Sequence, residues 1–138
     1  VLEREAGGVR RVELAPSYDH ASSLGRELSD AERIARLGGR DGRRTVAGYA
    51  RRTRSALYRT AADARPLSPV LAFAEAALRS PRAARVWLDR IDGLCQAALS
   101  TIVARVPAER MSEPARAFAL ALMDENRSAL RASPGVTQ

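Results

Sequence analysis

The sequence predicts a mainly α-helical fold, with a short N-terminal β-hairpin followed by a C-terminal helical bundle. Hydrophobic residues make up 46% of the 138 residues, and most of them are Ala, Leu and Val, a composition typical of helical proteins. Helix-starting signals recur in the second half of the chain, where Ser-Pro pairs precede periodic apolar residues. A Gly-Gly pair near the N-terminus separates two runs compatible with β-strands. We expect residues 1–138 to form one domain or part of one.

The hairpin is expected over residues 1–14. Its turn is Ala6-Gly7-Gly8, where glycine adopts a positive φ without steric cost. Pro16 ends the second strand, because proline donates no hydrogen bond to a β-ladder. Two strands alone are only marginally stable in water, so we expect the hairpin to pack on the helices or on another part of the protein.

Residues 29–67 predict short helices and an arginine-rich connector. Ser29 and Glu32 have the spacing of a capping box, in which each side chain accepts a hydrogen bond from the other residue's backbone N–H. The helix that they start is expected to end before Gly38-Gly39. A second short helix is expected from Thr45 to about Arg54.

Residues 68–132 predict a bundle of three helices. The first is expected to start at Ser68-Pro69, the second, which runs to about Val106, at Ser80-Pro81, and the third at Ser112-Glu113-Pro114. Helical spacing of apolar residues predicts the faces that turn toward the core. These residues are Val70, Leu71, Ala74, Leu78, Val86, Leu88, Ile91, Leu94, Cys95, Ala98, Ile102, Val103, Phe118, Ala121, Leu122 and Leu130.

Cysteine usage and hydropathy indicate a cytoplasmic chain. Cys95 is the only cysteine, so no intrachain disulfide can form, and its apolar neighbours predict a buried structural thiol. No apolar run approaches the roughly 20 residues of a membrane-spanning helix. The charged N-terminal residues do not resemble a signal peptide. Residues 133–138 are expected to form a disordered tail.

Positive charge is concentrated in residues 36–59. The formal net charge is +7, and all 23 basic residues are Arg. A GC-rich gene explains the preference for Arg over Lys, but not the surplus of charge. Tyr49 and Tyr58 are interleaved with the arginines, an arrangement compatible with a phosphate-rich partner such as nucleic acid, or with an acidic protein. It is equally compatible with a solvated basic segment. The candidates for anion or partner binding are Arg43, Arg44, Arg51, Arg52 and Arg54.

Asp19 is the candidate metal ligand. It lies in a loop of small and polar residues, 15–28, directly after the hairpin, and Mg²⁺ typically takes one or two protein carboxylates together with phosphate oxygens. Local chemistry alone favours a simpler role, in which Asp19 caps the following turn. His20 is the only histidine, so it has no histidine partner for a metal cluster. Ser22 and Ser23 lack the surroundings of a nucleophilic serine.

The run Leu14-Ala15-Pro16-Ser17-Tyr18-Asp19, followed by Ser22-Ser23-Leu24-Gly25, resembles the metal-binding segment of HipA-like serine/threonine kinases. These kinases are the toxins of HipA/HipB-type toxin–antitoxin systems. In that family a strand ends in Leu-x-Pro-x-aromatic-Asp and is often followed by small residues and Ser-Leu-Gly. Weaker similarity to the family's connector and C-terminal helices is carried by Tyr49-Ala50-Arg51-Arg52, Ser55-Ala56-Leu57-Tyr58, Val103-Ala104-Arg105-Val106-Pro107, Met111-Ser112, Phe118-Ala119 and Asn126-Arg127.

The resemblance covers about residues 1–130 and implies part of the C-lobe of a protein-kinase-like fold. It implies that Asp19 corresponds to the aspartate that holds Mg²⁺ on the nucleotide phosphates, although His20 departs from the Asp-Phe-Gly triplet of other kinases. Mg²⁺ and ATP would then be cofactors of the intact parent protein. A HipB-like helix-turn-helix antitoxin and the upstream kinase portion would be its partners.

The family's catalytic loop, of the type His-x-Asp-x-His-x-x-Asn, and the lysine of its N-lobe are not found in these 138 residues. We therefore expect no catalytic residue in this chain, no stable cofactor binding by the chain alone, and no phosphate transfer by it. The alternative is a non-catalytic basic helical module that binds nucleic acid or a protein through the arginine-rich connector.

Overall fold

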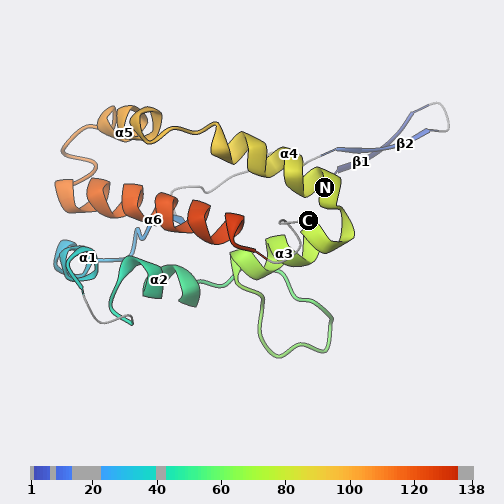
Figure 1. The fold of residues 1–138 in the computed structure, drawn as a ribbon, viewed down its shortest axis with the longest axis horizontal. Helices are drawn as coiled ribbons and strands as arrows, with labels where there is room; N and C mark the ends of the chain where they lie inside the picture. The colour runs from blue at the N-terminus through green and yellow to red at the C-terminus, as the bar shows by residue number, and fades with distance from the viewer. Residues whose placement is uncertain (1, 7–8, 14–22, 40–42, 134–138) are drawn as a thin grey trace.

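Six helices and two strands make up the part of the protein that the structure describes. The computed structural model describes residues 2–6, 9–13, 23–39 and 43–133, and only the backbone of the two strands. Strands β1 (Leu2–Ala6) and β2 (Val9–Glu13) pair antiparallel, with Leu2 opposite Glu13. The helices are α1 (Asp30–Leu37), α2 (Val46–Arg52), α3 (Pro69–Arg79), α4 (Pro81–Asp92), α5 (Gln96–Ala104) and α6 (Glu113–Arg131) (Figure 1).

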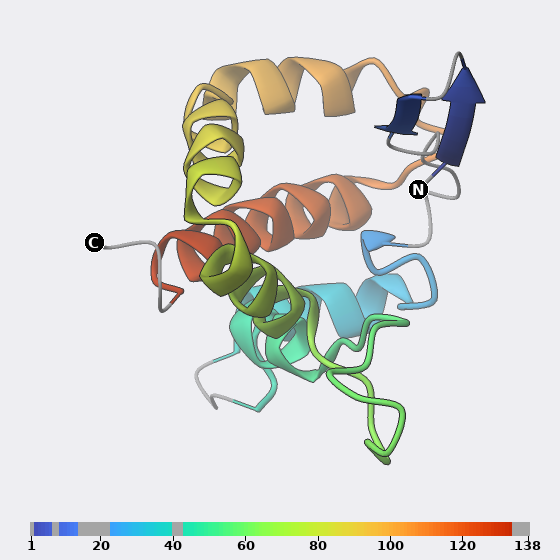
Figure 2. The same ribbon diagram turned by 90° about the vertical axis from the view of Figure 1, so that its right-hand side faces the viewer.

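The predicted fold class is wrong for the packed body of the protein. Residues 23–39 and 43–133 consist of α1–α6 and contain no strand, so this body is all-helical rather than a hairpin joined to a three-helix bundle. Strands β1 and β2 lie at its periphery (Figures 1 and 2). The sequences of both strands, LEREA and VRRVE, contain more charged than apolar residues, a composition that does not favour burial in a packed layer.

Side-chain caps start the helices where the sequence predicts. The capping box of α1 is confirmed, because Ser29 N donates to Glu32 Oε2 at 2.8 Å and Glu32 N donates to Ser29 Oγ at 3.3 Å. Thr45, Ser68 and Ser112 cap α2, α3 and α6 in the same way, each accepting from the backbone N–H three residues later. Local sequence therefore determines these four helix starts.

The long helix predicted from residue 81 to about Val106 is wrong. Helix α4 ends at Asp92, and Cys95 adopts an extended conformation as the N-cap of α5, where its Sγ accepts from Ala98 N at 3.4 Å. Residues 68–132 thus form four helices. Because the break changes the helical register, Cys95 is exposed rather than buried. Leu94 and Ile102, which were expected in the core, are 48% and 60% exposed.

Helix α3 turns only part of its predicted face inward, since Ala74 is buried as expected but the leucines are not. Ala74 and Ala77 are buried, whereas Leu71 and Leu78 are 50% and 63% exposed. Small residues allow α3 to approach α4 and α6 closely, and both of these helices contact it. The larger side chains were predicted inside because hydrophobicity alone does not distinguish close approach by alanine from burial of leucine.

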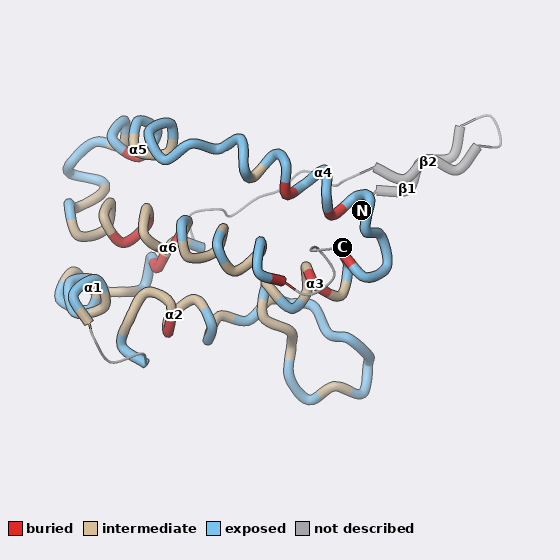
Figure 3. Tube along the Cα trace, viewed as in Figure 1, coloured by how far each residue is buried: buried red, intermediate tan, exposed pale blue. Residues whose placement is uncertain are grey.

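Helix α6 lies at the centre of the body. Helices α1 and α2 pack on one side of it and α4 and α5 on the other (Figures 1 and 2). Buried residues gather along α6, where Phe118, Ala119 and Leu122 are at most 1% exposed, while exposed residues prevail along α4 and α5 (Figure 3). Among the described residues no helix has the length and apolarity to span a membrane.

Two arginines of α6 hold α5 in place. Arg116 donates to the backbone carbonyls of Val103 and Val106, at the C-terminal end of α5. Arg127 donates to the carbonyl of Leu94, just before α5 begins, at 2.9 Å. These bonds give donors to the carbonyls of Leu94 and Val106 and add a second donor to the carbonyl of Val103, which also accepts from Val106 N.

Ser133 packs against the end of α6, contrary to the prediction that residues 133–138 form a disordered tail. Ser133, which was assigned to the disordered tail, is 1% exposed, and its Oγ donates to the carbonyl of Ala129 at 3.1 Å. Residues 134–138 lie outside the described residues.

Candidate functional site

Gly25, six residues after Asp19, lies against α6. Asp19, His20 and Ser22 themselves lie outside the described residues. Gly25 has a φ of +71°, a conformation that residues with a side chain rarely adopt. A Cβ at this position would lie 2.6 Å from Cε1 of Phe118, a side chain with no exposed surface. Only glycine fits here, so the last residue of the Ser-Leu-Gly run has a structural requirement.

Arg33 holds the turn at Gly25 against α1. Its NH2 donates to the carbonyls of Gly25 and Arg26, at 3.1 and 3.3 Å. Its NH1 donates to Asp30 Oδ1 at 2.6 Å, and the Arg33 side chain is only 13% exposed. Leu28 N also donates to the carbonyl of Gly25, at 3.1 Å. One largely buried arginine therefore joins the turn to the first turn of α1.

Asp30 connects this turn to the N-terminus of α6. Ser112 Oγ donates to Asp30 Oδ1 at 2.8 Å and accepts from Ala115 N at 3.3 Å as the N-cap of α6. The hydrogen bond from Ser112 and the neighbouring Arg33 lower the pKa of Asp30. We refer to the five residues Gly25, Asp30, Arg33, Ser112 and Phe118 as the Gly25 anchor. The anchor fixes the chain six residues after Asp19.

A pocket of 450 Å³ lies beside the anchor, between the turn at Gly25 and the N-terminus of α6. Arg26 and Arg110 line it together with apolar side chains, and no acidic residue does so within the described part of the chain. The full lining is Leu24, Arg26, Arg33, Val106, Arg110, Met111, Ser112 and Ala115. Guanidinium groups and a helix N-terminus both favour anions such as phosphate.

The five predicted anion-binding arginines are all exposed and lie at the two ends of α2. Arg43 and Arg44 precede the helix, Arg51 and Arg52 form its last turn, and Arg54 follows it. Arg52 NH2 donates to the carbonyl of Arg43 at 2.6 Å, which links the two ends. Arg54 NH1 donates to the carbonyl of Arg51 at 3.2 Å. The structure thus brings the predicted candidates onto one short helix and its flanks.

Arg36 of α1 joins this group. Its guanidinium carbon lies 5.4 Å from the ring centroid of Tyr49 on α2, within the range of a cation–π contact. With Glu32, Ala35 and Arg44 it lines a pocket of 240 Å³. The Nε of Arg36 is buried and has no hydrogen-bond partner among the described residues. A buried donor without a partner is unfavourable, so this group would gain from an acceptor.

The predicted interleaving of aromatic residues with arginines is only partly present. Tyr49 packs edge-on against Phe118, with ring centroids 5.4 Å apart, so its ring belongs to the core. Tyr58 is 52% exposed. Arg59 does not belong to this basic group, because it forms an ion pair with Glu75 of α3, with 2.6 Å between NH2 and Oε1.

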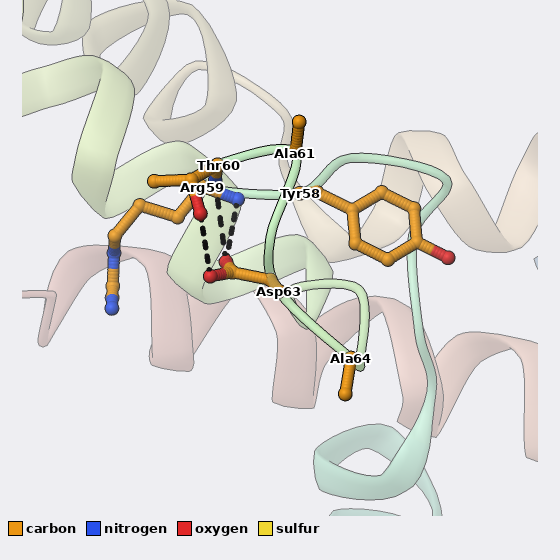
Figure 4. A pocket seen from close by; sticks show the side chains of 6 residues that line it. All are labelled: Tyr58, Arg59, Thr60, Ala61, Asp63 and Ala64. Atoms are coloured by element: carbon orange, nitrogen blue, oxygen red, sulfur yellow. Dashed lines mark hydrogen bonds between the residues drawn. The ribbon is translucent and has the colours of Figure 1, made fainter.

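The closed loop between α2 and α3 contains a further pocket, of 470 Å³ (Figure 4). Asp63 supplies its carboxylate, which accepts from Arg59 N at 3.1 Å and from Thr60 Oγ at 2.8 Å. The Thr60 hydroxyl, followed by its backbone N–H, lowers the pKa of Asp63. The Asp63 carboxylate accepts hydrogen bonds within its own loop. We therefore attribute this pocket to the structure of the loop.

Sequence reasoning missed the Gly25 anchor. The capping role of Ser112 was visible in the sequence, but its bond to Asp30, across 82 positions, leaves no local signal. Within the described ranges, no group of three or more His, Cys, Asp or Glu side chains is arranged to hold a metal ion. The assignment of Asp19 as a metal ligand stays a prediction.

Comparisons with known proteins found no match to this chain among protein-family models, curated proteins or solved structures. The resemblance to HipA-like kinases rests on the motif residues of the sequence.

Proposed function

We propose that this chain is the C-terminal helical part of a HipA-like, ATP- and Mg²⁺-dependent serine/threonine kinase, and that its helices hold the segment bearing Asp19. The observation that carries the proposal is the Gly25 anchor. The family motif is often followed by Ser-Leu-Gly, and Gly25, the last residue of this run, has a conformation and a close contact with Phe118 that exclude a side chain. A sequence feature of the family thereby acquires a physical reason in this fold.

Attachment of the chain at Gly25, six residues after Asp19, suits the role proposed for Asp19. When bound, Mg²⁺ neutralises charge on the nucleotide phosphates, and phosphoryl transfer depends mainly on positioning and electrostatics. Asp19 would supply a carboxylate to the metal, and the anchor would limit how far that carboxylate can move. Arg26 and Arg110, in the pocket beside the anchor, would attract phosphate oxygens.

The apolar surface of the helical body also supports a place within a larger kinase. Leu71 and Leu78 on α3, Trp87 on α4 and Ile102 on α5 are between 46% and 63% exposed. Large exposed apolar side chains on several helices are typical of surfaces that contact other protein. The upstream kinase portion is the partner that the motif resemblance implies.

The proposal is tested by comparing this purified chain with the product of the whole reading frame that contains it. Transfer of the ATP γ-phosphate to a protein substrate is expected from the longer product and not from residues 1–138, which lack the catalytic-loop motif. If the 138-residue chain transfers phosphate and Asp19→Ala abolishes this transfer, the proposal that the chain is inactive without the upstream kinase portion is wrong. A reading frame that starts at Val1 would favour the alternative, a non-catalytic basic module.

A further inference from the structure

We propose that the pocket beside the Gly25 anchor binds a phosphate monoester whose organic part is apolar. Two arginines, Arg26 and Arg110, would hold the phosphate, and the apolar side chains of the lining would cover the organic part. The inference deepens the proposed function, on which it rests for a source of phosphorylated ligands. A phosphorylated serine or threonine side chain, which is the product of such a kinase, and a free phosphate ester share this chemistry.

Arg26 and Arg110 supply positive charge that the pocket does not neutralise. Both residues are exposed, and within the described residues neither guanidinium takes part in a hydrogen bond or an ion pair. Glu27 and Glu109, their acidic neighbours in the sequence, are exposed and do not belong to the lining. The described ranges contribute no other acidic side chain to the pocket, so an anion that enters it meets no negative charge in the lining.

The two arginines, rather than the start of α6, carry the site. At the start of this helix Pro114 has no N–H, and Ala115 N already donates to the Ser112 hydroxyl at 3.3 Å. Arg33 also lines the pocket but adds no net charge, because it forms an ion pair with Asp30 at 2.6 Å. Two positive charges therefore remain, and a phosphate monoester, with a charge of about −1.5 to −2 at pH 7, matches them. Planar guanidinium groups bind phosphate oxygens through paired hydrogen bonds.

The remaining side chains of the lining form an apolar wall. Leu24, Val106, Met111 and Ala115 are half-buried, so each keeps apolar surface that a ligand can cover. Removal of such surface from water favours binding. The volume of 450 Å³ lies within the range of roughly 300–1,000 Å³ that is typical of pockets for small ligands. A phosphate joined to an apolar group therefore suits this lining better than inorganic phosphate does.

Main-chain hydrogen bonds fix the positions of both arginines before a ligand binds. The carbonyl of Arg26 accepts from Arg33 NH2 at 3.3 Å, and Arg110 N donates to the carbonyl of Pro107 at 3.0 Å. Two segments that lie far apart in the sequence thus contribute one arginine each to the same pocket. A site that is already formed loses less entropy on binding.

The test is isothermal titration calorimetry of the purified 138-residue chain with phenyl phosphate, inorganic phosphate, benzoate and Mg-ATP. The variant is Arg26→Gln with Arg110→Gln, at two exposed positions. The matched control, Arg79→Gln with Arg82→Gln, removes the same charge where α3 meets α4, at the other end of the helical body from the start of α6 (Figure 1). A third variant, Met111→Ala, shortens the apolar wall. Thermal unfolding checks that every variant is folded.

We expect phenyl phosphate to bind more tightly than inorganic phosphate, which lacks the apolar group, and more tightly than benzoate, which carries a single charge. The double arginine variant should weaken phenyl phosphate binding by about tenfold or more, because charge-assisted hydrogen bonds are lost, whereas the control should keep the wild-type affinity. Met111→Ala should weaken the binding of phenyl phosphate but not of inorganic phosphate. If Met111→Ala disturbs folding, the comparison of these two ligands on the wild type tests the same point.

Two peptides distinguish the sources of the ligand. One carries phosphoserine between two leucines, and the other carries serine in its place. A phosphopeptide that binds more tightly than phenyl phosphate would assign the pocket to phosphorylated protein, whereas one that binds more weakly would assign it to free phosphate esters. Both results support the shared chemistry.

Asp19→Asn separates this pocket from the proposed kinase activity. The substitution should leave phenyl phosphate binding by the 138-residue chain unchanged, although it should abolish phosphoryl transfer by the longer product. Phenyl phosphate binding by a longer product that transfers no phosphate would refute the kinase role alone. Transfer by a longer product whose pocket binds no phenyl phosphate would refute the pocket alone.

Four results would overturn the inference about the pocket. The wild type binds no phenyl phosphate; benzoate or inorganic phosphate binds as tightly as phenyl phosphate; the arginine variant and its control lose equal affinity; or Mg-ATP binds more tightly than phenyl phosphate through the same two arginines. The last result would assign the pocket to the nucleotide instead.

Discussion

At the scale of single residues, Gly25 belongs both to the sequence motif and to the packing of the helical body. Its positive φ and its approach to Phe118 exclude a side chain, whereas Gly38 has a φ of −91°, with its nearest contact 3.6 Å from a built Cβ. The two glycines lie 13 residues apart, and they differ in backbone conformation and in the space available to a Cβ. They therefore form a natural pair for mutation.

Gly25→Ala is expected to lower the free energy of unfolding by more than the roughly 1–2 kcal/mol of a left-handed alanine, because the new Cβ also displaces Phe118. Gly38→Ala should leave stability unchanged or raise it by up to about 1 kcal/mol, since its backbone suits alanine. Urea unfolding of both variants measures the difference. Equal stabilities would show that the contact between Gly25 and Phe118 is wrong.

Asp30 makes the anchor sensitive to acid. The Ser112 hydroxyl, and then Arg33, lower the pKa of Asp30 below its unfolded value of 3.8. A lowered pKa in the folded state stabilises the protein above pH 3.8, and this contribution is lost as pH falls through the folded value. In urea unfolding between pH 7 and pH 2, Asp30→Asn should therefore cost stability near neutrality and progressively less toward pH 2. A cost that is the same at every pH would exclude the proposed role of the carboxylate charge.

At the scale of helices, local caps were predictable and the break between α4 and α5 was not. Ser29, Ser68 and Ser112 act within four residues of sequence, so their patterns carry the full information. At the break, Arg127 of α6 donates to the carbonyl of Leu94 from 33 positions away. Apolar periodicity continues through Gly93, so the sequence favoured one helix. The bond from Arg127 supports the broken form, and no local pattern reveals it.

The break predicts unequal costs for two leucine substitutions. Leu122→Ala on α6, where the side chain is 1% exposed, should lower the free energy of unfolding by about 2–5 kcal/mol. Leu94→Ala, at 48% exposure, should cost less than about 1 kcal/mol. Chemical denaturation of the two variants provides the comparison. A large loss of unfolding free energy for Leu94→Ala would instead support the continuous helix that the periodicity indicated.

At the scale of the whole molecule, the sequence predicted helical content but not its arrangement. The core is built on Phe118, Ala119 and Leu122 of α6, and much of the remainder is alanine, which lets helices approach closely. Composition cannot reveal which alanines do so. The candidate arginines were correctly placed on the surface, because long charged side chains rarely lie inside. The pocket at Arg36 required the contact between α1 and α2, which no local pattern encodes.

The central claim is that the helical body holds a metal-binding Asp19 in a HipA-like kinase. Its most direct measurement is the rate of phosphoryl transfer from ATP by the product of the whole reading frame, with and without Asp19→Asn. This substitution keeps the shape of the side chain and removes the charge offered to Mg²⁺. We predict loss of transfer with an unchanged thermal unfolding temperature, because a charge held for a metal contributes little to stability without it. Undiminished transfer by the Asn variant would contradict the claim and return Asp19 to the role of a turn-capping residue.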